Sequence, residues 1–196
     1  MSKSYKIALI GGDGVGPEVV AAGRKVLEHI AKLDSELSFE FENFPWSCEY
    51  YKQTGIMMPE NGIEILQAFD AILLGAVGQP DVPDHISLRG LLIEIRKEFD
   101  QYVNLRPVKL LKGAPCPILG VQRESVDMIY VRENTEGEYA GIGGLFEDHA
   151  EQTALFTRKG CERVIRYAFE LARKEGRSIT SVSKANALNY SMVFWD

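Results

Sequence analysis

The sequence predicts an α/β fold, and three consecutive features support this prediction. Residues 5–10 (YKIALI) form a short apolar run that is typical of a buried strand. Residues 11–16 (GGDGVG) form a glycine-rich loop, and residues 19–30 then place apolar side chains at helical spacing. A strand, a tight loop and a helix in this order open an α/β unit.

The glycine-rich loop departs from the dinucleotide-binding fingerprint. Gly12, Gly14 and Gly16 are each two residues apart, and Pro17 stands where the GxGxxG pattern has its last glycine. A proline is well tolerated in the first turn of a helix. We therefore interpret the loop as a tight strand-to-helix turn.

Another strand and two short helices are predicted before residue 70. Residues 37–44 (LSFEFENF) alternate between apolar and polar side chains, which indicates a second strand. Residues 48–54 predict a short helix that ends at Gly55, and residues 59–69 predict another with its isoleucines and leucine facing inward.

A buried strand and a candidate ligand-binding segment follow. Residues 70–76 (DAILLGA) predict a fully buried strand. The polar, proline-bearing segment 77–87 (VGQPDVPDHIS) comes directly after the carboxyl end of that strand, and ligands of open α/β sheets bind at such ends. The segment is therefore a candidate cofactor or substrate contact, and the alternative is a plain connection.

The next elements lead to a stretch that combines a cation with a phenol. We expect a helix over residues 88–99, an extended segment over 102–108, a turn over 112–117 and a strand over 127–132. This last strand delivers Arg132, and Tyr139 follows beyond a polar turn. A guanidinium grips a carboxylate through a planar fork, and a phenol can donate a proton. The stretch is therefore suited to a small anionic substrate.

The last part of the chain predicts two strands and a long helix. Residues 152–156 predict a strand, and residues 158–175 predict an amphipathic helix that Gly176 ends. Residues 178–183 predict a further strand that delivers Lys184, and a helical pattern begins again at residue 188.

Composition and motifs exclude several classes of function. The hydrophobic content of 45% and charged content of 26% are ordinary for a globular protein, and the net charge of -6 argues against bulk nucleic-acid binding. The longest apolar run is too short to span a membrane. No GxxxxGK[ST] loop is present, so a nucleoside triphosphatase is not expected.

The cysteines and histidines predict neither disulfides nor a metal site. The three cysteines are scattered and lack CxxC spacing, which favours a reduced, cytoplasmic protein. The three histidines have no spacing typical of metal ligands.

Three arginines form the candidate substrate grip. Arg96, Arg106 and Arg132 lie near the ends of apolar elements, and each of them alone is more often a surface ion-pair partner. Together, without an excess of lysines, they fit a dicarboxylate, and each bidentate contact can contribute about 1.5–3 kcal/mol. Tyr139 alone is usually a packing residue, and Lys184 alone is usually solvated, although small Ala185 leaves room around its ammonium.

Five ordered motifs resemble the isocitrate/isopropylmalate dehydrogenases. They are GDGVGPEV (12–19), GAVGQP (75–80), IRKEFDQYVNLRPV (95–108), VRENTEGEYAG (131–141) and SKANAL (183–188). The match runs nearly end to end. The segments 48–62, 82–88 and 98–111 most closely resemble the branch of tartrate dehydrogenase/decarboxylase and D-malate dehydrogenase. An isopropylmalate-dehydrogenase-like two-domain α/β fold, which is not a true Rossmann fold, is thereby implied.

The resemblance also implies roles for individual residues. Arg96, Arg106 and Arg132 would hold substrate carboxylates, Lys184 would be the base towards the substrate hydroxyl, and Tyr139 would protonate the enolate left by carbon dioxide. The cofactor NAD would lie against a set of residues near the end of the third expected strand, namely Gly75, Ala76, Val77, Gly78 and Ser87.

The metal, the domains and the partner follow from the same resemblance. The family uses Mn²⁺ or Mg²⁺, and its aspartate ligands would lie beyond Asp196. No metal ligand is therefore expected in this chain, and the chain alone would be inactive. Residues 1–99 would be part of the cofactor-side domain and residues 100–196 the start of a substrate and dimer domain. In such a homodimer the lysine reaches into the active site of the other subunit.

Two alternatives remain open. Leu91, Leu92 and Ile93 could form the apolar slot of a 3-isopropylmalate dehydrogenase, although Glu94 and Arg89 nearby favour a small polar substrate. Arg89 stands where the branch usually has an aromatic residue, and it either alters substrate preference or faces solvent. A non-catalytic regulatory or binding subunit is the other alternative, and the presence of an acid and a base argues against it.

Overall fold

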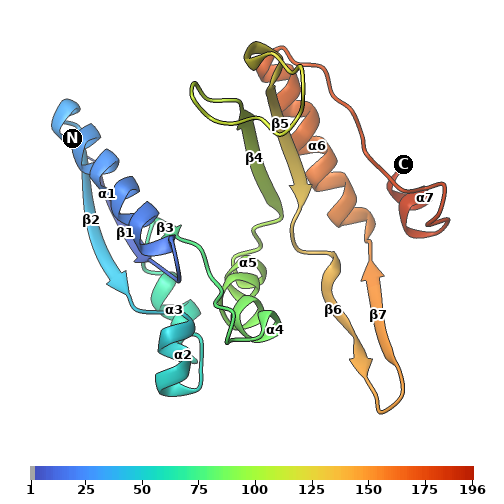
Figure 1. Ribbon diagram of the computed structural model, residues 1–196, viewed down its shortest axis with the longest axis horizontal. Helices are drawn as coiled ribbons and strands as arrows, with labels where there is room; N and C mark the ends of the chain where they lie inside the picture. The colour runs from blue at the N-terminus through green and yellow to red at the C-terminus, as the bar shows by residue number, and fades with distance from the viewer. Residues whose placement is uncertain (1–2) are drawn as a thin grey trace. The chain divides into compact units, whose positions relative to one another are not determined.

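The computed structural model describes residues 3–196, and the chain divides into two compact units. The first unit ends at Glu98 and the second begins at Phe99 (Figure 1). No helix within residues 3–196 combines the length and the apolar character that a membrane crossing requires. Each unit is described by itself.

The first unit is built on a three-stranded parallel sheet in the order β2-β1-β3. Its strands are β1 (Lys3–Ile10), β2 (Leu37–Phe44) and β3 (Ala71–Leu74), and the long helix α1 (Gly16–Leu33) connects the first two. A core cluster of Ile7, Leu9 and Val20 joins the sheet to α1. The predicted strand, loop, helix and strand at the start of the chain are thus all present.

The helix α2 (Cys48–Thr54) has the predicted bounds because both of its ends are capped. The hydroxyl of Ser47 accepts a hydrogen bond from the backbone N–H of Tyr50 at 3.1 Å, and Gly55 ends the helix in the left-handed conformation with φ of 81°. The next helix, α3 (Gly62–Leu66), is shorter than the predicted 59–69, since it has no side-chain cap at Asn61.

Two predictions about the segment 70–99 are wrong. The strand β3 is only half-buried at Ile72, Leu73 and Leu74 rather than fully buried, because within the described residues it pairs only with β1 and forms a sheet edge. The supposed loop 77–87 already contains a helix, α4 (Asp84–Ser87). It continues through the π-helical turn η1 (Leu88–Leu92) into α5 (Ile93–Glu98).

The second unit contains two antiparallel strand pairs and one long helix. The pair β4 (Val103–Lys109) and β5 (Asp127–Glu133) packs against α6 (Arg158–Glu175). The pair β6 (Gly137–Leu145) and β7 (Ala150–Leu155) forms a ribbon that extends away from them (Figure 1). A short 3₁₀ helix, η2 (Arg123–Ser125), precedes β5. The strand β6 was not expected, because its glycine-rich sequence lacks strand alternation.

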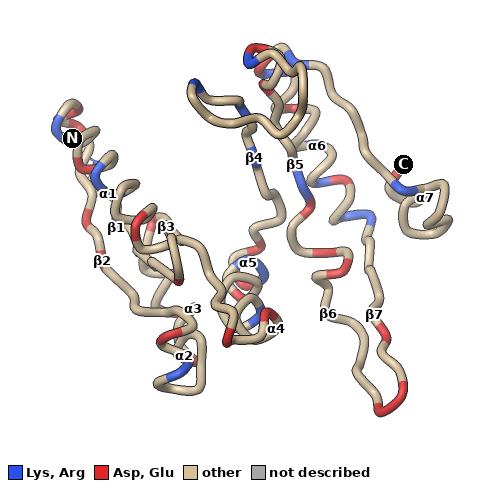
Figure 2. Tube along the Cα trace, viewed as in Figure 1, with Lys and Arg blue, Asp and Glu red and all other residues tan. Residues whose placement is uncertain are grey.

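The helix α6 has the predicted bounds, and the reason again is capping. The Thr157 hydroxyl accepts from the N–H of Gly160 at 3.0 Å, and Gly176 ends the helix with φ of 64°. Cys161 and Val164 lie on its buried face. Charged side chains of both signs follow each other along the helix (Figure 2).

The strand predicted over residues 178–183 is wrong. The segment forms no ladder with any strand of residues 3–196, and instead it contacts the end of the chain. The indole N–H of Trp195, in α7 (Ser191–Trp195), donates to the hydroxyl of Ser181 at 3.2 Å, and Ser183 donates to Asp196 at 3.0 Å. The β-branched residues Ile179, Thr180 and Val182 favour a strand locally, but a strand requires a neighbouring strand to pair with.

Candidate functional site

Arg132 and Tyr139 lie together in the second unit. Arg132 stands near the end of β5 and Tyr139 near the start of β6, and the residues between them form a tight turn. The guanidinium carbon of Arg132 lies 5.4 Å from the centre of the Tyr139 ring, a cation–π contact. The tyrosine is 37% exposed, so its hydroxyl can reach a ligand. The structure therefore brings the predicted cation and phenol to one place.

The Arg132 guanidinium has unused hydrogen-bonding capacity. Its Nε is buried and has no hydrogen-bond partner within residues 3–196, and its Nη2 makes a long contact of 3.4 Å with Asn134 Oδ1. An arginine carries five N–H donors and no acceptor. The buried Nε is not open to a ligand, so a carboxylate would accept from the Nη groups at the end of the guanidinium.

Arg106 shares a sheet face with Arg132. Asn104 is opposite Arg132 in the β4–β5 register, and Arg106 is two residues further along β4, so all three side chains point to the same face. The Nε of Arg106 donates to Asn104 Oδ1 at 3.0 Å, and Arg106 is otherwise exposed. Two arginines on one face can meet two carboxylates of one small molecule.

Asn134 organises this face, although the sequence reasoning did not single it out. It is 5% exposed, and its Oδ1 accepts from Asn104 Nδ2 at 3.2 Å as well as from Arg132. Its Nδ2 donates to the carbonyl of Gln101 at 2.9 Å. No sequence signal marks this role, because the residues it joins are about thirty positions apart.

The other predicted catalytic and substrate residues lie elsewhere in the chain. Arg96 is half-buried on α5 and belongs to the first unit. Lys184 is exposed in the segment between α6 and α7, where its carbonyl accepts from the N–H groups of Ala187 and Leu188, both at 2.9 Å. Within the described residues no contact joins Lys184 to Arg132 or Tyr139.

The predicted cofactor segment begins where β3 meets the glycine-rich loop. A Cβ at Gly75 would lie 2.2 Å from the Gly11 carbonyl oxygen, so only glycine fits at this close approach. Gly78 has φ of 136° and open space around its Cα. The backbone of residues 75–78 is thus packed closely against the glycine-rich loop at Gly75, whereas the space beside Gly78 is open. A flat ligand ring could contact the backbone at this open position.

Asp13 fixes this segment and is a second residue that the sequence reasoning missed. The carboxylate is 4% exposed and accepts from the backbone N–H groups of Cys48 and Gly78, both at 3.0 Å, and from Gln79 Nε2 at 3.2 Å. It therefore ties the glycine-rich loop to α2 and to residues 78–79. A carboxylate inside a tight glycine loop is the sequence signal that could have indicated it.

Ser87 and the nearby cysteine are buried. The Ser87 hydroxyl donates to the Asp84 carbonyl at 3.5 Å and lies inside the α4 turn, so it does not face an open surface. Burial raises the pKa of the Cys48 thiol to about 11, and the neighbouring Asp13 carboxylate adds to the increase. Cys48 is therefore protonated at neutral pH and is not a nucleophile.

The described part of the chain lacks a set of side chains arranged as metal ligands. Within residues 3–196 no group of three or more His, Cys, Asp or Glu side chains is close enough to hold an ion. The residues present therefore do not form a metal site by themselves.

Comparison with known proteins identifies the chain's relatives. A family model described as isocitrate/isopropylmalate dehydrogenase matches residues 6–196. The chain is 50% identical over 199 residues to a probable tartrate dehydrogenase/decarboxylase of Bacillus subtilis (strain 168), a match that covers 99% of this chain and 56% of that protein. It is 50% identical over 204 residues to D-malate dehydrogenase (decarboxylating) of Escherichia coli (strain K12), with 100% and 56% covered.

Solved structures give the same kind of match. The crystal structure of isocitrate dehydrogenase from Methylococcus capsulatus aligns with a TM-score of 0.79 at 31% sequence identity, and the alignment covers 97% of this chain and 54% of that one. The chain thus spans about half the length of the relatives it matches.

Proposed function

The chain belongs to the isocitrate/isopropylmalate dehydrogenase family, and from this premise we propose that it is part of an NAD-linked, metal-dependent dehydrogenase. The proposed substrate is a small 2-hydroxy dicarboxylic acid of the tartrate or D-malate type, oxidised with or without decarboxylation. The names of the most similar relatives support this substrate class. The observation that carries the proposal is the Arg132–Tyr139 pair, in which a guanidinium lies beside an exposed phenol.

The residues of this chain would act in a definite order. Arg132 and Arg106 bind substrate carboxylates on one face of the β4–β5 pair, and Arg96 is proposed as a further carboxylate ligand. Lys184 takes the proton of the C2 hydroxyl as the hydride leaves C2. When carbon dioxide departs, Tyr139 donates its phenolic proton to the enolate carbon as general acid.

The first unit would serve the cofactor. NAD accepts the hydride when it is bound, and we propose that residues 75–78 contact its nicotinamide side, while Ser87, whose hydroxyl is buried inside the α4 turn, would contribute only by supporting that turn. The open backbone at Gly78, which Asp13 holds in place, supports this assignment. The second unit would be the substrate and dimer domain. A cytoplasmic homodimer, with Lys184 serving the partner subunit's active site, is part of the same proposal.

The divalent metal would require residues outside this chain. The described residues supply no ligand set, so we derive no step through the ion. We therefore propose that the 196 residues alone do not turn over. Metal-dependent NADH production by the purified 196-residue chain would refute this.

We propose that a small polar substrate is preferred over isopropylmalate. Of the three residues of the possible apolar slot, Leu91 is fully buried in the first unit, and Leu92 and Ile93 are half-buried. Arg89 and Glu94 on the same helical path are exposed. These exposed charged side chains support the proposed preference.

The test is an activity assay on a complete protein that contains this chain. Supplied with Mn²⁺ and NAD, it should reduce NAD in the presence of tartrate or D-malate, and it should act poorly on isopropylmalate. The proposal fails if no small 2-hydroxy diacid is oxidised. Binding of these acids without turnover would instead favour the non-catalytic subunit.

A further inference from the structure

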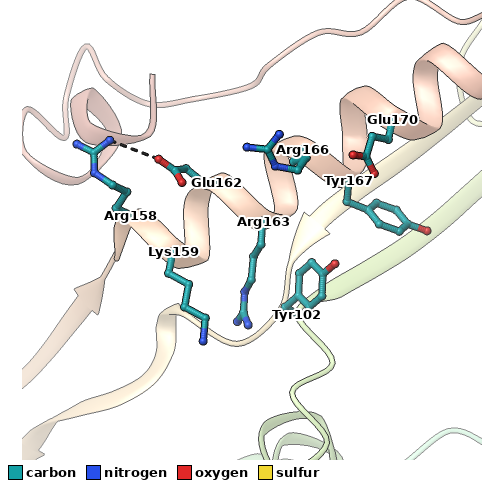
Figure 3. Close-up of a pocket in the computed structure, with 8 residues that line it drawn as sticks. All are labelled: Tyr102, Arg158, Lys159, Glu162, Arg163, Arg166, Tyr167 and Glu170. Carbon is teal, nitrogen blue, oxygen red and sulfur yellow. Dashed lines mark hydrogen bonds and ion pairs between the residues drawn. The ribbon is translucent and has the colours of Figure 1, made fainter.

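A charged groove lies along α6 in the second unit and does not include Arg132 or Tyr139 (Figure 3). It encloses about 480 Å³, and its lining residues are Tyr102, Arg158, Lys159, Glu162, Arg163, Arg166, Tyr167 and Glu170. Among these cations Arg163 differs, because its side chain is only 20% exposed. In Figure 3 it points from α6 towards Tyr102, whereas Arg166 extends away from it.

Arg163 makes contacts to two separate backbone segments. Its Nη1 donates to both carboxylate oxygens of Asp100, each at 2.8 Å, and its Nη2 donates to the hydroxyl of Thr135, also at 2.8 Å. Its guanidinium lies 4.6 Å from the centre of the Tyr102 ring. The planar fork therefore bridges the entry to β4 and the turn between β5 and β6.

The Asp100 contact holds a strained position. Asp100 has φ of 45°, the left-handed region, and it is the one residue other than glycine with positive φ among residues 3–196. Such a conformation is unfavourable for a residue with a side chain and persists where surrounding contacts fix it. Asp100 directly precedes the segment whose Gln101 carbonyl binds Asn134.

The Thr135 contact reaches the turn that separates Arg132 from Tyr139. The Thr135 hydroxyl accepts from Arg163 and donates to Glu133 Oε1 at 2.8 Å. The Glu133 carboxylate also accepts from the backbone N–H groups of Thr135 at 3.0 Å and Glu136 at 2.7 Å. The Glu133 carboxylate thus holds the turn together through hydrogen bonds within it, and Arg163 adds a hydrogen bond from α6 to the Thr135 hydroxyl.

A second contact ties the same turn to the start of α6. The Glu136 carboxylate accepts from the backbone N–H of Thr157 at 2.8 Å and from its hydroxyl at 2.6 Å. A Cβ at Gly160 would lie 2.2 Å from Glu136, so glycine is required for this approach. The turn therefore has two anchors on one rigid helix, and Arg163 is the one that also holds β4.

We infer that Arg163 is a positioning residue that fixes the Arg132–Tyr139 pair by clamping Asp100 and Thr135 together. This inference rests on the proposed function for the roles of the pair, but the clamp itself is a property of the fold. The contacts of Arg163 are to Asp100, Thr135 and Tyr102 rather than to the pair itself. It acts on the backbone turn that sets the separation of guanidinium and phenol.

The test compares Arg163→Lys with Arg166→Lys in the complete protein. A lysine at 163 keeps the charge but cannot bond Asp100 and Thr135 with one planar group. Arg166 is the matched control, since it lies one turn further along α6 with an exposed side chain. Thr135→Val, which removes only the hydroxyl arm, serves as a second variant in case Arg163→Lys fails to fold.

Two measurements decide the inference. Hydrogen exchange of the Thr135 and Glu136 amides should accelerate at least about tenfold in R163K and T135V, with the α6 amides from Val164 onward unchanged. The KM for tartrate or D-malate should rise and kcat should fall, each about tenfold, because a displaced pair binds and protonates less well. A loss of folded protein alone lowers apparent kcat without changing KM.

The outcomes separate the two proposals. Exchange and kinetics in R163K and T135V that match the wild type and R166K overturn the inference. If the wild type itself oxidises no diacid, the proposed function fails, and the exchange measurement still decides whether Arg163 holds the turn.

Discussion

Replacing Asp13 by asparagine should destabilise the first unit selectively. Asp13 Oδ1 accepts from the Cys48 N–H at 3.0 Å and from Gln79 Nε2 at 3.2 Å, while Oδ2 accepts from the Gly78 N–H at 3.0 Å. Asparagine has one carbonyl oxygen and one NH₂ group in the same shape. In either orientation its NH₂ group faces a backbone or side-chain donor, so at least one buried N–H loses its acceptor.

The magnitude follows from the two kinds of loss. A buried donor left unpaired costs about 1–3 kcal/mol, and a hydrogen bond to a charged group is worth about 1 kcal/mol more than a neutral one. Gln79 cannot compensate by turning its Oε1 towards the new NH₂ group of the asparagine, because this oxygen already accepts a hydrogen bond from Lys52 Nζ at 2.6 Å. We expect the free energy of unfolding of the first unit to fall by about 3 kcal/mol.

The assay uses the two tryptophans, one in each unit. Trp46 is 2% exposed in the first unit, so in a Trp195→Phe background its fluorescence during urea titration reports that unit alone. Asp81→Asn is the matched control, because Asp81 is an exposed carboxylate whose ion pair with Lys52 is screened by solvent, so its loss should change stability little. Equal shifts of the unfolding midpoint for both variants would falsify the reasoning.

Three further predictions concern single groups. Tyr139→Phe in the complete protein should lower kcat about 10²–10⁴-fold with little change in KM, because the ring remains beside Arg132 and only the proton donor is lost. Steady-state kinetics with an unchanged kcat would exclude Tyr139 as the general acid. Burial and Asp13 raise the pKa of the Cys48 thiol to about 11, so Cys48 should react with an aromatic disulfide at pH 8 far more slowly than the half-buried Cys116. Peptide mapping of the labelled protein measures both rates, and equal rates would contradict the assigned burial. The Arg177 guanidinium lowers the pKa of the Asp127 carboxyl, so the pair stabilises the fold above the ordinary aspartate pKa, and this contribution is lost as the pH falls through the lowered pKa. Asp127→Asn should therefore flatten the acid side of a plot of unfolding free energy against pH. An unchanged plot would show that the pair is not linked to folding.

Much of the fold could be read from local sequence, and the family match confirms the α/β prediction and the resemblance. Strand β2 and helices α2 and α6 have the predicted bounds because their signals are local. A two-residue alternation marks the strand. A hydroxyl at the first end and a glycine at the last end mark each helix, as Ser47 and Gly55 do for α2.

The sequence-based predictions fail where pairing with a strand distant in the sequence decides the structure. Residues 178–183 are rich in β-branched side chains, but the described chain offers no strand beside them, and Ser181 and Ser183 instead form hydrogen bonds with Trp195 and Asp196. The strand β6 has glycines that locally disfavour a strand, but β7 pairs with it. Burial of β3 was overestimated because an apolar run does not reveal whether a strand lies at a sheet edge.

The sequence by itself determined which chemical groups the protein has: an arginine and a phenol within a short stretch, a glycine loop that is not a dinucleotide fingerprint, and an acidic overall charge. Tertiary structure alone decided how these groups are held. Asp13 meets Gly78 across 65 positions, and Arg163 meets Asp100 across 63. Such contacts depend on how helices and strands pack, and packing is a property of the whole unit rather than of any local pattern.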